Sequence, residues 1–128
     1  MNNNIIGQPI ARVDARDKVT GEAKYSGDLT MAGMLHAKIL FSERLHARVL
    51  DVDTAAAEAV PGVVAVFTSK DVPVNEYGLQ TMDQPVLCGH GSSKPGGDVV
   101  RCVGDQIALV VAETERAAAR ARDMIRVE

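Results

Sequence analysis

The sequence contains no tryptophan, and aromatic residues make up only 3% of its 128 residues. A hydrophobic core must therefore consist of aliphatic side chains, for which the 46% hydrophobic content is sufficient. Long apolar runs are also absent, because the longest, Ile107 to Ala112, is far too short to span a bilayer. No basic segment followed by an apolar one stands at the N-terminus, so we expect no secretory signal.

Cysteine and excess positive charge are scarce as well. Cys88 and Cys102 are too few for a disulfide framework, and we interpret them as reduced thiols of a cytoplasmic protein. The net charge of -3 lacks the basic excess that a nucleic-acid-binding domain would show. We therefore expect no nucleic-acid and no membrane partner. The length of 128 residues predicts a single domain.

Period-two patterns predict strands at 34–41 and 45–52, joined by the polar segment 42–44 into an antiparallel hairpin. The residues on the core-facing side would be Leu35, Ala37, Ile39, Phe41, Leu45, Ala47 and Val49. The residues on the opposite side would be His36, Lys38, His46 and Arg48. We therefore expect half-buried strands in this part of the chain.

Helices are predicted at 55–59 and 114–127, where good helix formers follow capping residues: Asp53 or Thr54 in the first, Thr114 in the second. The apolar stripe of the second helix would consist of Ala117, Ala121, Met124 and Ile125. Further strands are predicted at 63–67, 99–103 and 106–112, with one turn through Asp71 and a hairpin turn at Gly104-Asp105. The fold class is α+β, with mixed or antiparallel strands and two main helices.

Two long segments lack such patterns. Residues 1–33 contain scattered glycines and alternating charges, which indicate either a solvated extended arm or a docked segment before a folded core at 34–128. Residues 74–98 are rich in glycine, proline and serine, which predicts a long loop. Neither segment has the apolar periodicity to anchor itself, so we expect both to be mobile unless a partner packs on them.

Histidine and glycine-rich patterns give no catalytic or metal site. The loop 89–97 contains Lys94, but a proline follows it and the Walker spacing is missing, which favours a surface loop. His36, His46 and His90 lack the spacing of metal ligands. The predicted hairpin could still bring the first two together, although two polar residues on an outer strand face are the simpler interpretation.

The cysteines and arginines have equally simple interpretations. Cys102 lies in an apolar strand pattern next to Arg101, where cysteine usually acts as a small hydrophobic residue. The arginines of the last helix are typical of a solvated face. We predict that the chain contains no catalytic, cofactor-binding or metal-binding residue. The chain also stops without a tail or a capping glycine, which indicates a fragment of a longer protein.

A series of short motifs does resemble a known family. In order they are Gly7-x-Pro9-x-x-Arg12-x-Asp14-x-x-x-Lys18-Val19-Thr20-Gly21-x-Ala23-x-Tyr25-x-x-Asp28-Leu29, Gly33-Met34-Leu35-His36-Ala37, Ser42-x-x-x-His46-Ala47-Arg48-Val49, Pro61-Gly62-Val63-x-Ala65-Val66-Phe67-Thr68-x-x-Asp71-Val72-Pro73 and Val100-Arg101-x-Val103-Gly104-x-x-Ile107-Ala108-x-Val110-Val111-Ala112-Glu113-Thr114. The series resembles the N-terminal domain of the molybdenum-binding (large) subunit of the xanthine dehydrogenase and aldehyde oxidase family. Large subunits of carbon monoxide dehydrogenase and hydroxybenzoyl-CoA reductase are similar. The segment from Asn75 to Asp98 departs most from the pattern.

The resemblance implies an α/β-hammerhead fold and a place in a molybdopterin-dependent oxidoreductase. Such enzymes hydroxylate an N-heterocycle or aldehyde with water as the oxygen donor, and iron–sulfur (2Fe-2S) clusters and usually FAD carry the electrons away. The catalytic glutamate and the pterin-binding loops lie downstream of this domain in the family. We therefore expect a scaffold domain, inactive alone, whose partners are the downstream molybdenum-binding domains, iron–sulfur and flavin domains or subunits, and a small-molecule substrate. The alternative is a stand-alone binding or assembly module with the same fold.

Overall fold

The computed structural model describes residues 6–128, which fall into two compact units. The first is the described part of Met1–Ala32, and the second is Gly33–Glu128. The first unit contains a short helix, α1 (Ala15–Thr20), and a 3-10 turn, η1 (Ser26–Asp28). None of its described residues is buried.

Helix α1 differs from the extended arm that the sequence predicts. Gly21 ends the helix in the left-handed conformation (φ 77°), which glycine adopts without steric cost. Asp14 and Lys18 form an ion pair of 2.6 Å one turn apart, and the Thr20 hydroxyl donates to the Arg16 carbonyl oxygen. Local charge and capping therefore support one and a half turns of helix without any core contact.

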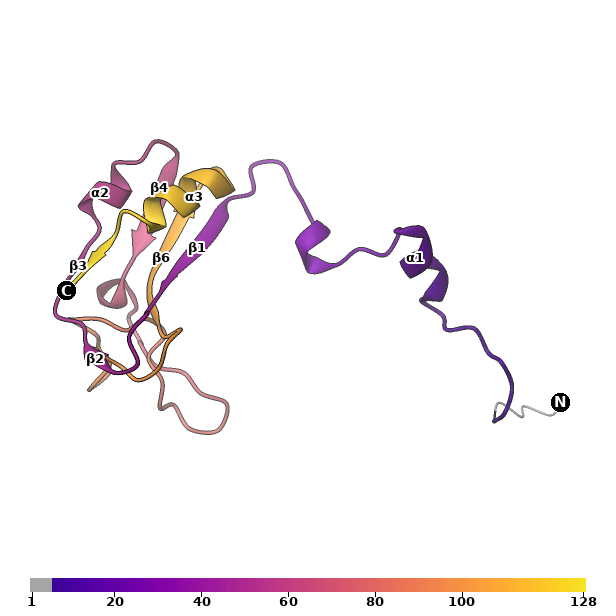
Figure 1. Ribbon diagram of the computed structural model, residues 1–128, viewed down its shortest axis with the longest axis horizontal. Helices are drawn as coiled ribbons and strands as arrows, with labels where there is room; N and C mark the ends of the chain where they lie inside the picture. The colour runs from indigo at the N-terminus through magenta and orange to yellow at the C-terminus, as the bar shows by residue number, and fades with distance from the viewer. Residues whose placement is uncertain (1–5) are drawn as a thin grey trace. The chain divides into compact units, whose positions relative to one another are not determined.

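The second unit is built on a three-stranded antiparallel sheet (Figure 1). Its strands are β1 (His36–Phe41), β6 (Gln106–Ala112) and β4 (Val63–Phe67), in the order β1-β6-β4. Two smaller antiparallel pairs join β2 (Ala47–Arg48) to β5 (Val99–Val100) and β3 (Val52–Asp53) to β7 (Arg126–Val127). The longest strand, β6, therefore lies in the middle, and each pair joins segments far apart in the sequence.

Both predicted hairpins are wrong. Strand β1 pairs instead with β6, and Ser42, which the sequence pattern assigns to a local turn, is buried and bonded to the 104–105 segment just beyond this ladder. The Ser42 amide donates to the Asp105 carbonyl oxygen (2.8 Å), and the Gly104 amide donates to the Ser42 carbonyl oxygen (2.9 Å). The second predicted hairpin fails because β5 ends at Val100 and pairs with β2.

Both predicted helices are confirmed, together with the strand at 63–67 and the turn through Asp71. Helix α2 covers Ala55–Glu58, α3 covers Glu115–Arg122, and the 3-10 turn η2 covers Ser69–Asp71. The Thr114 hydroxyl caps α3 by accepting the Ala117 amide proton at 3.1 Å. Helix α3 does not continue to Val127 as predicted, because the chain turns after Arg122 into β7, which pairs with β3.

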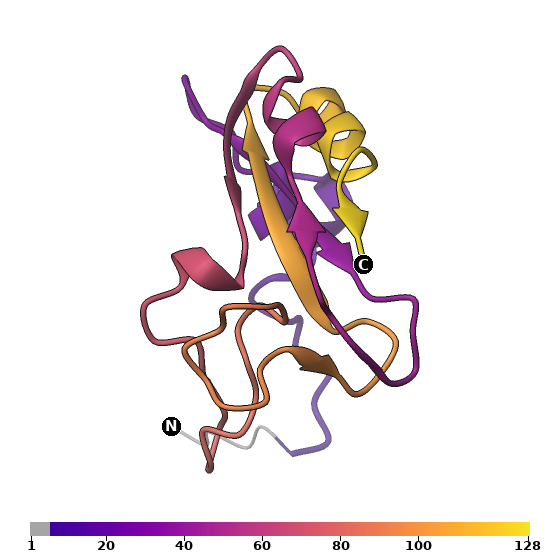
Figure 2. The same cartoon turned by 90° about the vertical axis from the view of Figure 1, so that its left-hand side faces the viewer.

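The helices pack on one face of the sheet (Figure 2). Helix α3 contacts β1 and β6, and α2 contacts β4 and α3. The core between these layers consists of Ala57, Val60, Ala108, Val110, Ala121 and Ile125. A second core cluster, under β2 and β5, consists of Val49, Cys88, Val100 and Ile107. Of the predicted helical stripe, Ala121 and Ile125 are buried, whereas Met124 is 39% exposed; Ala118, outside the predicted stripe, is buried.

The predicted faces of β1 are reversed. Leu40 packs against the helix-side core, so His36 and Lys38 share that face by strand alternation. Lys38 remains at the rim and forms an ion pair of 2.6 Å with Glu115 in the first turn of α3. Ile39 therefore lies on the opposite face of the sheet. For β2 the predicted core-facing side is confirmed, because His46 is exposed and Ala47 packs against the second core cluster.

Candidate functional site

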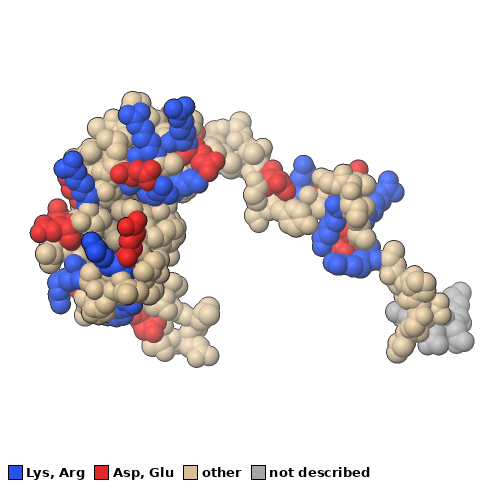
Figure 3. Space-filling model, in the orientation of Figure 1, with Lys and Arg blue, Asp and Glu red and all other residues tan. Residues whose placement is uncertain are grey.

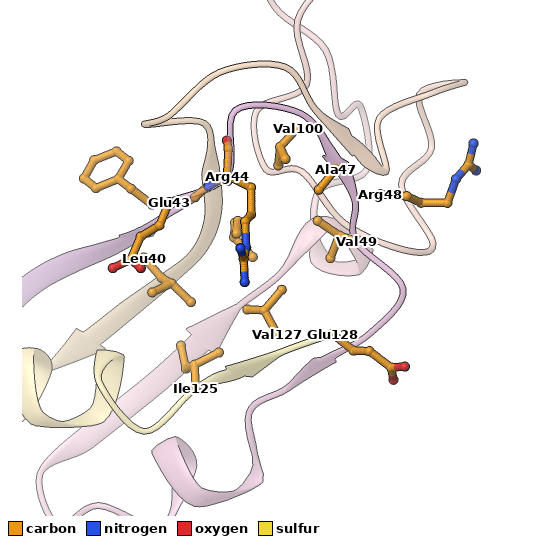
Figure 4. A pocket seen from close by; sticks show the side chains of 13 residues that line it. Leu40, Glu43, Arg44, Ala47, Arg48, Val49, Val100, Ile125, Val127 and Glu128 are labelled. Atoms are coloured by element: carbon orange, nitrogen blue, oxygen red, sulfur yellow. Dashed lines mark hydrogen bonds between the residues drawn. The ribbon is translucent and has the colours of Figure 1, made fainter.

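An apolar pocket of about 360 Å³ lies where β1, β2 and β7 end (Figure 4). Its walls include Leu40, Val49, Ile125 and Val127, and the exposed side chain of Arg44 points into it. Charged side chains, those of Glu43, Arg44, Arg48 and Glu128, also line the pocket, so it offers apolar contact within a charged rim. It contains no pairing of nucleophile and base that acid–base chemistry would require.

A more polar pocket of about 510 Å³ brings both cysteines together with Asp105. The Asp105 carboxylate accepts hydrogen bonds from the Arg101 amide (2.6 Å), the Cys102 amide (3.3 Å) and the Cys102 thiol (3.2 Å). Partial burial acts to raise the pKa of Asp105, but the hydrogen bonds from Arg101 and Cys102 outweigh it and lower that pKa. The carboxylate thus serves to hold the 101–105 turn.

The two thiols lack the setting that activates a nucleophilic cysteine. Burial, more than any charge nearby, raises the pKa of Cys88 to about 11. The hydrogen bond to the Asp105 carboxylate raises the pKa of Cys102, because the thiol is the donor in that bond. Both shifts favour the thiol form, whereas a nucleophilic cysteine is a thiolate.

The histidines do not converge. His36 lies in β1 and His46 precedes β2, and these strands belong to different sheets, so the hairpin that would bring them together does not exist. His90 is exposed in the long loop. Among residues 6–128, no three His, Cys, Asp or Glu side chains form a group that could hold a metal ion. Our expectation that the chain carries no site residue remains a prediction.

Lys94 of the glycine-rich loop is occupied by internal contacts. Its ammonium group lies 3.2 Å from a Glu76 carboxylate oxygen and 2.9 Å from the Met82 carbonyl oxygen. Its side chain is only 15% exposed, so it braces the loop and does not project toward a phosphate. The interpretation of this segment as something other than a phosphate loop agrees with these contacts.

Sequence reasoning missed the residue that anchors the long loop, Asn75. Its side chain is almost fully buried, and it donates to the Leu87 carbonyl oxygen and the Ser92 hydroxyl, both at 2.7 Å. It also accepts the Leu87 amide proton at 2.9 Å. The expectation that the loop 74–98 cannot anchor itself is therefore wrong. A polar anchor leaves no trace in apolar periodicity, which is the signal we used.

Charge on the described surface is mixed, and no span through a membrane is evident. Lysine and arginine side chains alternate with acidic ones on the face drawn in Figure 3. Around α3, Glu115 pairs with Lys38 and Asp123 pairs with Arg122. No helix within residues 6–128 has both the length and the apolar character that crossing a bilayer requires. The features available for binding are therefore apolar surfaces.

Comparison with known proteins identifies the fold and the family. Residues 20–128 match the model of the a/b hammerhead domain of aldehyde oxidase and xanthine dehydrogenase. The chain belongs to this family. The family resemblance and the α/β-hammerhead fold inferred from the motifs are thus confirmed.

Relatives of this family carry the domain as a small part of a larger protein. The chain is 49% identical over 97% of its length to a probable xanthine dehydrogenase subunit of Bacillus subtilis, and 36% identical over 91% to the xanthine dehydrogenase molybdenum-binding subunit of Escherichia coli O157:H7. It spans 16% of each. The crystal structure of quinoline 2-oxidoreductase from Pseudomonas putida 86 matches 93% of the chain at 34% identity with a TM-score of 0.78, and the chain covers 15% of that structure.

Proposed function

We propose that this chain is the hammerhead scaffold domain of a molybdenum hydroxylase. The carrying observation is the family match over residues 20–128, supported by relatives whose names include xanthine dehydrogenase and quinoline 2-oxidoreductase. The proposed whole enzyme oxidises an N-heterocycle or an aldehyde, with water as the oxygen donor, in the cytoplasm. Its partners are the downstream molybdenum-binding domains of the same subunit, together with iron–sulfur and flavin domains or subunits.

The described residues do not fit the redox groups of such an enzyme. An iron–sulfur cluster of this class needs four thiolates, and the chain has only two cysteines. The carboxylate bonded to Cys102, Asp105, is also engaged by two backbone amides of its own turn. We therefore assign no chemical step to this domain. The molybdenum cofactor and the clusters would be held by other parts of the enzyme.

The test compares the complete enzyme with the 128-residue chain. The complete subunit, purified with its iron–sulfur and flavin partners, should contain stoichiometric molybdenum and transfer oxygen from isotopically labelled water to an N-heterocycle or aldehyde. The 128-residue chain should do neither. Molybdenum retained by the short chain after dialysis would overturn the scaffold assignment. A complete subunit without molybdenum and without hydroxylation would favour the stand-alone binding module.

A further inference from the structure

The face of the sheet opposite the helices is covered by apolar side chains in two cross-strand rows. One row consists of Ala37, Val111 and Ala65, and the next consists of Ile39, Leu109 and Phe67. These six residues form what we call the outer sheet face. Each row crosses all three strands, so the face is continuous from β1 through β6 to β4.

The outer sheet face is incompletely covered within the described residues. Phe67 is 40% exposed, Ala37 is exposed, and the other four members are half-buried. On the helix-covered side of strand β6, Ala108, Val110 and Ala112 are completely buried. Strand β6 is therefore apolar on both faces, a pattern typical of strands that are buried on both sides. The sequence is suited to a second covering layer.

We propose that a downstream part of the same molybdenum-binding polypeptide packs on the outer sheet face. This inference rests on the proposed function. The relatives carry this domain within a polypeptide of which it forms 16%, so covering chain is available in the same molecule. The face contains no charged or polar side chain, and such composition is typical of permanently buried interfaces. Interfaces with exchangeable partners are more polar.

Accessibility of a cysteine at position 67 tests the proposal. In a Cys102→Ser background, Phe67→Cys is treated with a maleimide in the 128-residue chain and in the complete subunit without partner subunits. We expect labelling to be slower in the complete subunit by about tenfold or more, because a packed site reacts only through local opening. The Cys102→Ser parent reports the residual labelling of buried Cys88, and labelling in denaturant gives the common reference rate.

A charge substitution gives a second readout. Phe67→Lys should lower the thermal midpoint of the complete subunit by clearly more than that of the 128-residue chain, in which Phe67 is already 40% exposed. The matched control is Leu79→Lys, at a fully exposed loop position away from the sheet. If Phe67→Lys is as harmless as Leu79→Lys in the complete subunit, the outer sheet face is uncovered there and the proposal fails.

The other occupants give distinct results, each of which overturns the proposal. Protection of position 67 in the short chain, with the mass of a dimer, would identify a second copy. Protection that arises only when iron–sulfur or flavin subunits are added would identify a partner. Molybdenum content is measured on the same unsubstituted subunit, and hydroxylation is measured after its iron–sulfur and flavin partners are added. A subunit with molybdenum but fast labelling refutes only this inference, whereas protection without molybdenum refutes only the proposed function.

Discussion

The loop 74–98 and the arm 6–32 look alike in the sequence but differ in the structure. Both contain several glycines, and both lack apolar periodicity. The loop is fixed by the buried side chain of Asn75 and by the buried residues Leu87 and Cys88. The arm has no buried residue, and its order is confined to α1 and η1.

This difference shows that one buried asparagine side chain can fix a loop that has no apolar stripe to pack into the core. An asparagine side chain has both a donor and an acceptor, so it can satisfy a distant backbone amide and carbonyl group together. Asn75 does this for Leu87, twelve residues away, and thereby closes the loop. The arm contains Asp14 and Thr20, whose side chains bond only within one or two turns. Ordering by such local contacts is weak.

The largest expected effect follows from removing the anchor. Asn75→Ala leaves the buried amide and carbonyl of Leu87 without partners, and each unsatisfied group costs about 1–3 kcal/mol. We expect the free energy of unfolding to fall by about 2–4 kcal/mol, measured by urea titration. The matched control is Gln80→Ala, an exposed amide in the same loop, which should be neutral. Equal effects of the two substitutions would show that Asn75 does not hold the loop.

The secondary structure was more predictable than the pairing. The caps at Thr114 and at 53–54, and the apolar runs at 63–67 and 106–112, are local signals, and the structure contains each element. The pairing of β1 with β6 continues at Ser42, a polar residue that local rules assign to a turn. Its burial is a tertiary effect, which no window of neighbouring residues encodes.

In the candidate site, too, local features were predictable and tertiary ones were not. The exclusion of a Walker loop and of histidine ligands rested on spacing, which is local, and the positions of Lys94, His36 and His46 agree with it. The faces of β1 were assigned in reverse because period two does not say which face the helices will cover. Both faces of β6 are apolar, so the choice is made by where α3 docks.

A second prediction concerns the acid stability of the 101–105 turn, which precedes β6. The pKa of Asp105 is lowered in the folded state, so its ionised form contributes stability above the unfolded pKa of about 3.9. That contribution is lost as the pH falls through the lower folded pKa. Relative to Asp105→Asn, which does not titrate, the parent should lose more stability as the pH falls from about 5 to about 2. Parallel stability curves for the two proteins over that range would contradict the prediction.

A third prediction, with a smaller expected effect, compares substitutions of a loop lysine and an arm lysine. Lys94→Met keeps the aliphatic stem but removes the contacts to Glu76 and Met82, and should cost about 0.5–1 kcal/mol. Part of that loss should disappear in high salt, which screens the ion pair. Lys24→Met, at an exposed arm position, should have no measurable effect. A salt-independent loss at position 94 would assign its role to packing of the stem.

The smallest effect is expected in the arm itself, and a pair of identical substitutions isolates it. Val19 in α1 is 84% exposed, whereas Val100 in β5 is 1% exposed. Val100→Ala removes buried methyl groups and leaves a cavity, so it should cost about 2 kcal/mol. Val19→Ala removes the same atoms from a solvated surface and replaces a β-branched residue with a better helix former. We expect a change below about 0.5 kcal/mol, which can be of either sign.

The decisive comparison of the valine pair is made in the complete subunit as well as in the 128-residue chain. If Val19→Ala stays neutral in both, the arm is a solvated segment whose helix owes its existence to Asp14, Lys18 and Gly21 alone. If it becomes destabilising only in the complete subunit, the arm gains a covering layer there, as the expectation of a docked segment requires. A loss in the short chain equal to that of Val100→Ala would mean that Val19 is buried in solution, and the contrast between arm and loop would fail.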